Sequence, residues 1–183
     1  MRGGRLLTGV IPERLRWGVE LVAPRANDHV LEVGCGRGVA AAALGALLGD
    51  GGRLLAVDRS ATAIAAAAHR CEDLVAAGRV ALRQASLAEL DPADGAFDAV
   101  LAVNVNLFWT GSAATELGVL ARLLRPGGRL VVVYDPPTAE RHAQLDATLR
   151  RNLAAAGGWR VAVHTRAASG SALLAFVATR EPG

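Results

Sequence analysis

Short runs of apolar residues alternate along this chain with longer stretches rich in alanine and leucine. The short runs have the length and the β-branched content of buried strands, whereas the longer stretches place apolar residues at helical spacing. Regular alternation of the two kinds indicates strand–helix–strand units around a mostly parallel sheet. The pattern predicts seven strands, at residues 29–33, 53–57, 80–84, 97–103, 129–134, 160–165 and 172–179.

About six helices are expected between these strands, because glycine or proline stops each alanine-rich stretch. A lead-in helix at residues 12–22 ends before Pro24, and Ser60 is placed to cap a later one. The last two strands flank Ser169-Gly170-Ser171, a spacing that favours an antiparallel hairpin. Besides the lead-in helix, the sequence places helices at residues 39–48, 60–77 (the one that Ser60 caps), 113–124 and 139–156.

Length and continuity point to one domain. A chain of 183 residues can bury roughly 70% of its unfolded surface without disulfides or metals, and no internal repeat or linker interrupts the pattern. We therefore expect a single domain over residues 1–183, with residues 1–27 as a lead-in helix and residues 28–183 as the core. No run reaches the roughly 18 apolar residues of a membrane span, and no signal-like stretch develops at the start. A cytoplasmic location follows as an expectation.

The basic residues do not form a nucleic-acid footprint. The net charge is +3, and all 20 basic residues are arginines scattered along the chain, with Arg150-Arg151 as the only adjacent pair. Binding to phosphates needs a clustered stripe, so nucleic acid is not an expected partner. Cys35 and Cys71 are too few for a disulfide framework or a zinc site, and they are interpreted as reduced thiols with no metal.

A glycine-rich turn follows the first predicted strand and precedes a helix. It reads Gly34-Cys35-Gly36-Arg37-Gly38, and such a turn presents free backbone N–H groups to a ligand. Asp58 stands at the tip of the second strand, 20 residues beyond Gly38. A carboxylate in that place can accept both hydroxyls of a ribose, so the spacing predicts a cofactor of the adenosine type.

Glu32 distinguishes between adenosine cofactors. A dinucleotide fingerprint has an apolar strand residue there and a third glycine at Val39, and a pyrophosphate would be repelled by the carboxylate. The positive methionine end of S-adenosylmethionine suits Glu32 instead, which disfavours an NAD-dependent oxidoreductase. The alternative, a buried carboxylate satisfied by backbone N–H groups, stays open because such burial is costly but not excluded.

Three segments in register resemble the class I methyltransferases. Residues Val30 to Gly38 are similar to motif I of that family, Asp58 to its strand-two acid, and Leu123 to Leu130 to its turn into strand five. The resemblance covers the chain from about Asp28 onward. It implies an α/β three-layer sandwich with a mostly parallel sheet in the order 3-2-1-4-5-7-6, strand 7 antiparallel, and S-adenosylmethionine as cofactor, released as S-adenosylhomocysteine.

The resemblance also implies a set of cofactor contacts. The family's third motif usually carries Gly-Asp, with the aspartate near the adenine amino group, whereas this chain has Ala85-Ser86, and Ser86 can still form a hydrogen bond. The expected cofactor-binding residues are Glu32, Gly34, Cys35, Gly36, Gly38, Asp58, Arg59, Ser86, Leu87 and Asn104.

Residues after the fourth strand are expected to reach the acceptor. Asn106 and Trp109 occupy the stretch where this family begins its substrate pocket, although Trp109, like Trp17, is equally well interpreted as a core residue. The run Tyr134-Asp135-Pro136-Pro137 resembles a motif of enzymes that methylate base amino groups. Here it follows strand five and lacks the final aromatic, so we interpret it as a chain turn.

Methyl transfer needs alignment more than it needs a reactive side chain. The sulfonium already carries a good leaving group, so the protein aligns the donor and the acceptor and excludes water. A hydroxyl or ammonium acceptor also needs a base, and Asp135, His142 and Glu140 are the nearby candidates. The expected function is methyl transfer to a small-molecule acceptor by in-line displacement.

Three alternatives stay open beside that function. A non-catalytic S-adenosylmethionine-binding module is favoured by Ala85-Ser86 and by the absence of a clear base, an RNA methyltransferase is less favoured, and an oxidoreductase least. No large insertion after strand five forms a substrate cap, so a second subunit in a homodimer is one way to complete the pocket.

Overall fold

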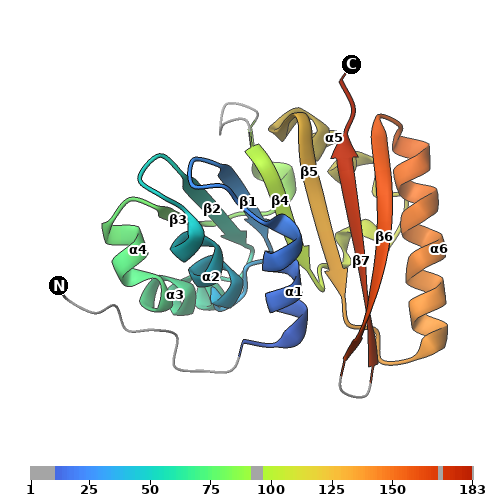
Figure 1. Cartoon of the computed structure of the whole chain (residues 1–183), viewed down its shortest axis with the longest axis horizontal. Coiled ribbons are helices and arrows are strands. Elements are labelled where there is room, and N and C mark those ends of the chain that lie inside the picture. The colour runs from blue at the N-terminus through green and yellow to red at the C-terminus, as the bar shows by residue number, and fades with distance from the viewer. Residues whose placement is uncertain (1–10, 92–96, 169–170, 183) are drawn as a thin grey trace.

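A seven-stranded sheet forms the middle layer of the computed structural model, which describes residues 11–91, 97–168 and 171–182 (Figure 1). The strand order is β3-β2-β1-β4-β5-β7-β6. β7 runs antiparallel to both β5 and β6, and the other paired strands are parallel. The predicted sheet order is therefore confirmed. The strands are β1 (His29–Val33), β2 (Arg53–Asp58), β3 (Val80–Gln84), β4 (Phe97–Val103), β5 (Leu124–Tyr134), β6 (Trp159–Ala168) and β7 (Ser171–Arg180).

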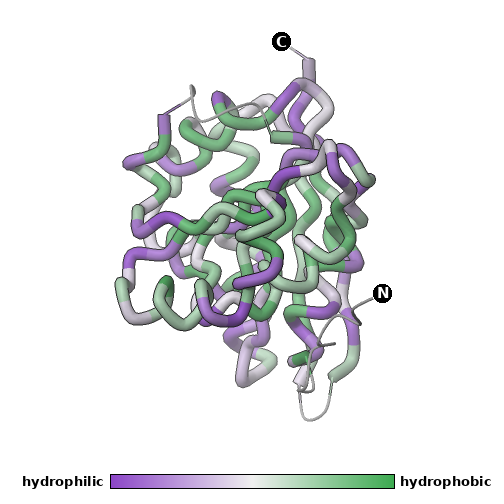
Figure 2. Tube along the Cα trace, turned by 90° about the vertical axis from the view of Figure 1, so that its left-hand side faces the viewer, coloured by the Kyte–Doolittle hydropathy of each residue, from purple (hydrophilic) through white to green (hydrophobic). Residues whose placement is uncertain are grey.

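Helices cover both faces of the sheet, which confirms the three layers. On one face α1 to α4 pack around Trp17, Val30 and Leu44, and on the other α5 and α6 pack around Leu31 and Phe176. Consecutive strand residues alternate between the two cores because side chains alternate across a strand. Figure 2 shows the apolar segments running through the middle of the molecule. The helices are α1 (Glu13–Val22), α2 (Val39–Leu47), α3 (Ala61–Arg70), α4 (Glu72–Ala76), α5 (Ala114–Leu123) and α6 (Ala139–Ala156), with short 3₁₀ turns η1 (Leu87–Glu89) and η3 (Asn106–Phe108).

One predicted helix is broken in two. The stretch at residues 60–77 forms α3 and α4, because Cys71 leaves helical geometry with φ −101° and ψ 13°. Cys71 is buried, and its thiol lies 3.8 Å from the carbonyl oxygen of Gly38. Packing against the glycine turn thus accompanies a bend that alanine-rich periodicity does not reveal.

The segment that the sequence predicts as a turn before the fifth strand is part of β5 in the structure. Leu124 already pairs with Phe97, and the register then shifts so that Ala99 pairs with Arg129. Gly127, at φ 79°, lies in the irregular stretch between these pairs, a conformation that glycine adopts without strain. The predicted start of this strand at Arg129 was therefore wrong, because β5 begins at Leu124, before the register shift. The last two strands are also longer than predicted, and residues 169–170 of the predicted hairpin turn lie outside the described residues.

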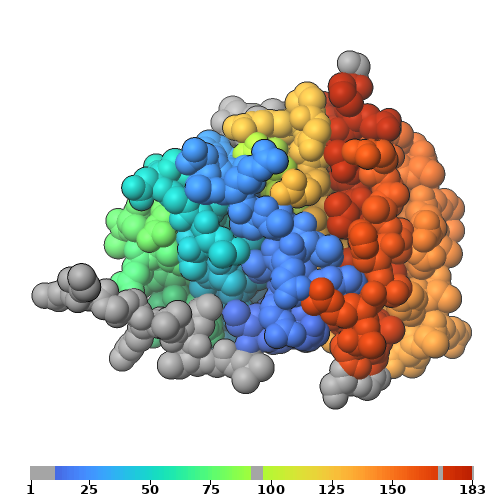
Figure 3. Space-filling model, viewed as in Figure 1, coloured from blue at the N-terminus to red at the C-terminus, as the bar shows by residue number. Residues whose placement is uncertain are grey.

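The lead-in helix α1 is anchored to the far end of the sheet. Arg166 of β6 stacks over the ring of Trp17 at 5.0 Å and forms ion pairs with Glu13 and Glu20. Arg129 of β5 donates a hydrogen bond to the α1 backbone as well. Figure 3 shows the surface of α1 beside that of the β6–β7 hairpin. Trp17 is 3% exposed within the core, which decides between its two interpretations.

Neither a membrane-spanning helix nor a metal-binding cluster is found among the described residues. Over residues 11–91, 97–168 and 171–182, no helix has the length and apolar character needed to cross a bilayer. In the same ranges, histidine, cysteine and acidic side chains do not gather in groups able to hold a metal ion.

Candidate functional site

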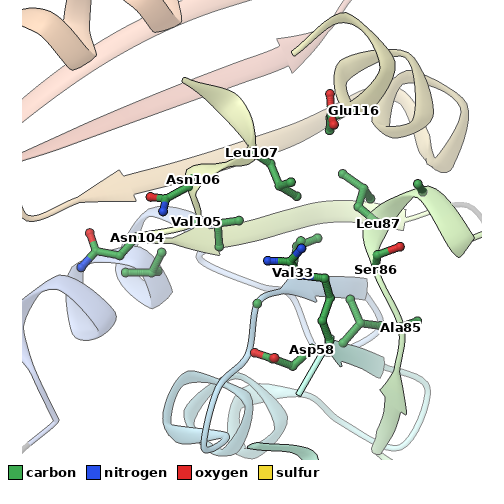
Figure 4. Close-up of a pocket in the computed structure, with 15 residues that line it drawn as sticks. Val33, Asp58, Ala85, Ser86, Leu87, Asn104, Val105, Asn106, Leu107 and Glu116 are labelled. Carbon is green, nitrogen blue, oxygen red and sulfur yellow. The ribbon is translucent and has the colours of Figure 1, made fainter. Parts of the chain in front are cut away.

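A cavity of about 330 Å³ lies where β1, β2 and β4 end (Figure 4). The connections that leave β1 and β4 run to opposite sides of the sheet, and such a switch in strand order leaves a crevice at the carboxyl ends of the strands. The size falls within the range of small-ligand sites. Six of the predicted cofactor residues line it: Gly34, Asp58, Arg59, Ser86, Leu87 and Asn104.

Several lining residues were missed by the sequence reasoning. Most are apolar residues at strand ends, whose side chains point into the crevice by the same alternation that fills the core. That periodicity was a usable signal for them, whereas Glu116 arrives from α5 and had no local signal. The missed residues are Val33, Val57, Ala85, Ala88, Val103, Val105, Leu107 and Glu116.

The three glycines of the turn have positive φ angles but different surroundings. The φ angles are 71° at Gly34, 52° at Gly36 and 74° at Gly38. A Cβ on Gly34 would stand 2.7 Å from Val105, and one on Gly38 would stand 2.8 Å from Ala67. A Cβ on Gly36 would have no atom within 4 Å. Two glycines therefore permit close packing, and the third keeps space open beside the turn.

The backbone N–H groups of the turn are largely occupied by the protein itself. Those of Gly34 and Cys35 donate to the carbonyl oxygen of Val57, and that of Gly38 donates to Cys35. The N–H of Gly36 donates to Asp58 Oδ2 at 2.9 Å. The expectation of free donors was wrong for these groups, because the turn folds against β2. The turn offers close approach to the main chain instead.

Asp58 is held in a fixed orientation at the end of β2. Its Oδ2 accepts from Gly36 and its Oδ1 accepts from the N–H of Ser60 at 2.9 Å, while Ser60 caps α3 through Ala63. A carboxylate has about four lone-pair directions, so each oxygen keeps one for a ligand. The side chain lines the cavity (Figure 4) and can accept two ligand hydroxyls.

Glu32 is a buried carboxyl group that lacks a partner. It is 3% exposed, and within the described residues no donor reaches its Oε2. Burial, and to a smaller extent the negative charge of Asp58, raises the pKa of Glu32 to about 8. The alternative of a carboxylate satisfied by backbone N–H groups therefore fails at Oε2. Glu32 does not line the cavity, and the group that would favour its ionised form is a cation beside the glycine turn.

The two thiols near the turn are unreactive. Burial, together with the negative charges of Glu32 and Asp58, raises the pKa of Cys35 to about 12. Burial likewise raises the pKa of Cys71 to about 11. Both thiols therefore stay protonated at neutral pH, and a nucleophilic role is excluded because the thiolate is the reactive form.

Hydrogen bonds between the ends of β4 and β5 fix one wall of the cavity. Asn104 adopts φ 54°, a left-handed conformation that asparagine tolerates, and its Oδ1 accepts from the N–H of Asp135 at 2.9 Å. The Tyr134 hydroxyl donates to the carbonyl oxygen of Val105 at 2.6 Å. Asn104 and Val105 are therefore held in place beside the glycine turn.

The two predicted acceptor residues lie in different places. Asn106 lines the cavity, whereas Trp109 packs against the apolar core, with Arg141 over its ring at 5.0 Å. The connection from β4 to α5, which carries both residues, is held by a buried residue of α6 that the sequence did not single out. Asn152 donates to the carbonyl oxygens of Phe108 and Gly111 at 3.0 and 2.9 Å.

The candidate bases stand apart from the cavity. Asp135 accepts a hydrogen bond from Ser171 and lies 3.7 Å from Arg14. His142 lines a separate hollow of about 480 Å³ beyond β5, and its Nε2 is buried without a partner in the described structure. Glu140 is exposed in the first turn of α6. The candidates are thus not brought together with Asp58.

The sequence of this chain matches a known protein family. A family model described as "Methyltransferase domain" matches residues 30–128, more than half of the chain. The protein-L-isoaspartate O-methyltransferase of Methylorubrum populi is 37% identical over 119 residues, which are 65% of this chain and 50% of that protein. A ubiquinone/menaquinone biosynthesis C-methyltransferase of Proteus mirabilis is 29% identical over 64% of this chain and 47% of its own length. The chain spans about half the length of these curated relatives.

Solved structures share the fold at low sequence identity. Magnesium protoporphyrin IX methyltransferase from Synechocystis, with S-adenosylmethionine bound, has a TM-score of 0.64 at 20% identity and covers 91% of this chain and 76% of that one. A putative rRNA methylase from Clostridium thermocellum has a TM-score of 0.68 at 21% identity, covering 95% and 100%. TrmN from Thermus thermophilus reaches 0.73 at 20%, covering 91% and 48%. At these identities the likeness concerns the fold alone.

Proposed function

This chain belongs to the class I S-adenosylmethionine-dependent methyltransferases, and we propose that it transfers the methyl group of this cofactor to a small-molecule acceptor. The observation that carries the proposal is the pair of acids around the glycine turn. Asp58 lines the cavity with one free lone-pair direction on each oxygen, and Glu32 is buried without a partner for Oε2. A ribose and an ammonium group supply what these two acids lack.

The residues present fit that cofactor along its length. Asp58 accepts the ribose hydroxyls, and the open space beside Gly36 admits the methionine portion close to the main chain. Glu32 lies behind the turn as the counter-charge for the ammonium group. The base lies between the apolar side chains of Leu87 and Leu107.

S-adenosylmethionine supplies an activated methyl group when it is bound. The protein then orients the reactants and excludes water. The hydrogen bonds Asn104–Asp135 and Tyr134–Val105 hold the wall past which an acceptor enters, and Asn106 stands at that entrance. Because the candidate bases lie outside the cavity, the proposal assigns no base among them.

A small-molecule acceptor is favoured over nucleic acid by the scattered arginines and by the names of relatives. These relatives include the fungal O-methyltransferase resE of Aspergillus sclerotiorum, 33% identical over 58% of this chain, besides the quinone C-methyltransferase. The putative rRNA methylase shares only the fold. The isoaspartate relative makes a protein carboxyl group the rival acceptor. A cytoplasmic location and a homodimer stay predictions.

Methyl transfer from labelled cofactor tests this proposal directly. The full chain is incubated with methyl-labelled S-adenosylmethionine and, separately, with phenols, quinols, small carboxylic acids and amines, an isoaspartyl peptide, and total RNA. We expect label in a member of the small-molecule panel and much less label with a preparation carrying Asp58→Ala. Label confined to RNA or peptide would overturn the choice of acceptor, and cofactor binding with no transfer to any acceptor would favour the non-catalytic module.

Alanine at two glycines of the turn should separate binding from folding. Gly38→Ala forces a Cβ against Ala67, and we expect it to lower the free energy of unfolding by about 3 kcal/mol. Gly36→Ala meets no atom, so its φ angle should cost only about 1–2 kcal/mol, but its Cβ fills the space proposed for the cofactor. Urea unfolding and calorimetric titration with S-adenosylhomocysteine measure the two effects. Unimpaired binding by a folded Gly36→Ala variant would contradict the proposed path of the cofactor.

A further inference from the structure

The cavity has an unexplained polar residue at the end away from Asp58. Figure 4 shows Glu116 beyond Leu87 and Leu107, on the opposite side of the cavity from the ribose-binding acid. Glu116 is half-buried in the first turn of α5, and the neighbouring Leu117 is buried in the core, which fixes the helix at this point. Over the described ranges, Glu116 forms neither a hydrogen bond nor an ion pair. It is a carboxylate with free acceptor capacity in a largely apolar wall.

The position where the family places its adenine-reading acid is engaged elsewhere. Ser86 follows Ala85 there, and both its backbone N–H and its hydroxyl donate to Glu89 Oε2, at 2.6 and 2.7 Å. These hydrogen bonds lower the pKa of Glu89, so its carboxylate stays ionised and holds Ser86. The loop after β3 thus closes on itself, and the base that lies against Leu87 needs an acceptor from another element.

Adenine needs an acceptor because its exocyclic amine carries two N–H donors. Leaving such a donor unpaired in an apolar cavity is costly, and a carboxylate acceptor gives a stronger hydrogen bond than a neutral one. Asp58 occupies the opposite side of the cavity, where it is assigned to the ribose. Glu116 is the other carboxylate among the residues that line the cavity.

We infer that Glu116 determines specificity for adenine, by accepting a hydrogen bond from the exocyclic amine of the base between Leu87 and Leu107. This inference rests on the proposed function, since it concerns the same cofactor. It assigns the reading of the base to α5, whereas the family's usual position lies after β3. The departure at Ala85-Ser86 is then compensated and does not weaken the cofactor site.

A ligand that lacks only the amine tests the inference by binding alone. Calorimetric titration compares S-adenosylhomocysteine with its 6-deamino analogue, in which hydrogen replaces the amino group, against the parent, Glu116→Ala and Glu116→Gln. For the parent we expect a preference for the amine of roughly tenfold to a hundredfold, as for a hydrogen bond to a charged group. Glu116→Ala should bring the ratio close to one, mainly by weakening S-adenosylhomocysteine, and Glu116→Gln should retain part of it.

The matched control changes an acid that does not line the cavity. Glu72→Ala removes an exposed acid from the first turn of α4 and should leave both affinities unchanged. A ratio that stays the same in Glu116→Ala, or that disappears in Ser86→Ala instead, would overturn the inference while the proposed cofactor stands. A parent that binds neither ligand would remove the proposed function together with it.

Discussion

Asp58→Ala is expected to weaken the binding of S-adenosylhomocysteine about a hundredfold. The lost carboxylate accepts two ribose hydroxyls in the proposed complex, and hydrogen bonds to a charged group contribute about 1.5–3 kcal/mol each. Loss of Asp58 also frees the N–H groups of Gly36 and Ser60, which anchor the turn. Because these groups are close to the surface, water can replace the carboxylate, so the variant should remain folded.

Calorimetric titration at neutral pH measures this loss. Asp58→Asn keeps the shape and one acceptor oxygen, so an intermediate affinity is expected from it. Asp50→Ala, an exposed acid in the turn before β2, serves as the matched control and should bind like the parent. If Asp58→Ala bound as tightly as the parent, the ribose would not lie on this residue, and the assignment of the cavity would be wrong.

Glu32→Gln is expected to make the ligand-free protein more stable. The pKa of Glu32 is about 8 in the folded chain, against an ordinary 4.5. As pH rises through this window, the unfolded chain has lost the proton and the folded chain still holds it. The free energy of unfolding therefore falls by about 1.4 kcal/mol per pH unit and levels off above pH 8. A glutamine does not titrate, so the variant should gain about 2–3 kcal/mol at pH 7.5.

The same substitution should impair cofactor binding. An amide cannot counter the charge of an ammonium group, so S-adenosylhomocysteine is expected to bind at least about tenfold more weakly. Urea unfolding between pH 5 and 8.5 and titration calorimetry give the two readouts, with Glu72→Gln as the control. In the parent, binding should also release protons near pH 7, since the ligand favours the ionised carboxylate. A variant with the parent's pH dependence of stability would show that Glu32 does not carry the proposed proton.

The expected gain in stability and loss of binding in Glu32→Gln have one physical cause, the buried carboxyl group. A buried carboxyl group without a partner in the described residues lowers the stability of the free protein. Leu31 and Val33 flank Glu32 along β1, and the buried Ala56 and Leu101 pair with it on β2 and β4. Retaining a destabilising group is typical of positions whose role lies in ligand binding. We propose that Glu32 is such a position in this chain.

The sheet could be predicted because each strand is a separate apolar run, and the resemblance of three motifs to a known family implied the strand order. What the sequence did not reveal depends on contacts between distant segments. The break at Cys71 accompanies close packing against Gly38, and the early start of β5 comes from a register shift against Phe97. Local propensity has no access to such contacts.

The site was predictable where a residue is identified by its place on a strand end. Asp58 and Asn104 are of this kind, and both line the cavity. The use of the turn's N–H groups by β2 could not be foreseen, because it needs the register of β1 against β2. Glu116 and Asn152 come from helices that meet the loops only in the folded chain.

A crystal structure of the full chain grown with S-adenosylhomocysteine tests the central claim most directly. We expect density in the cavity at the ends of β1, β2 and β4, with the ribose on Asp58, the ammonium group toward Glu32 and the base between Leu87 and Leu107. An empty cavity at saturating ligand, or the ligand bound elsewhere on the molecule, would contradict the account.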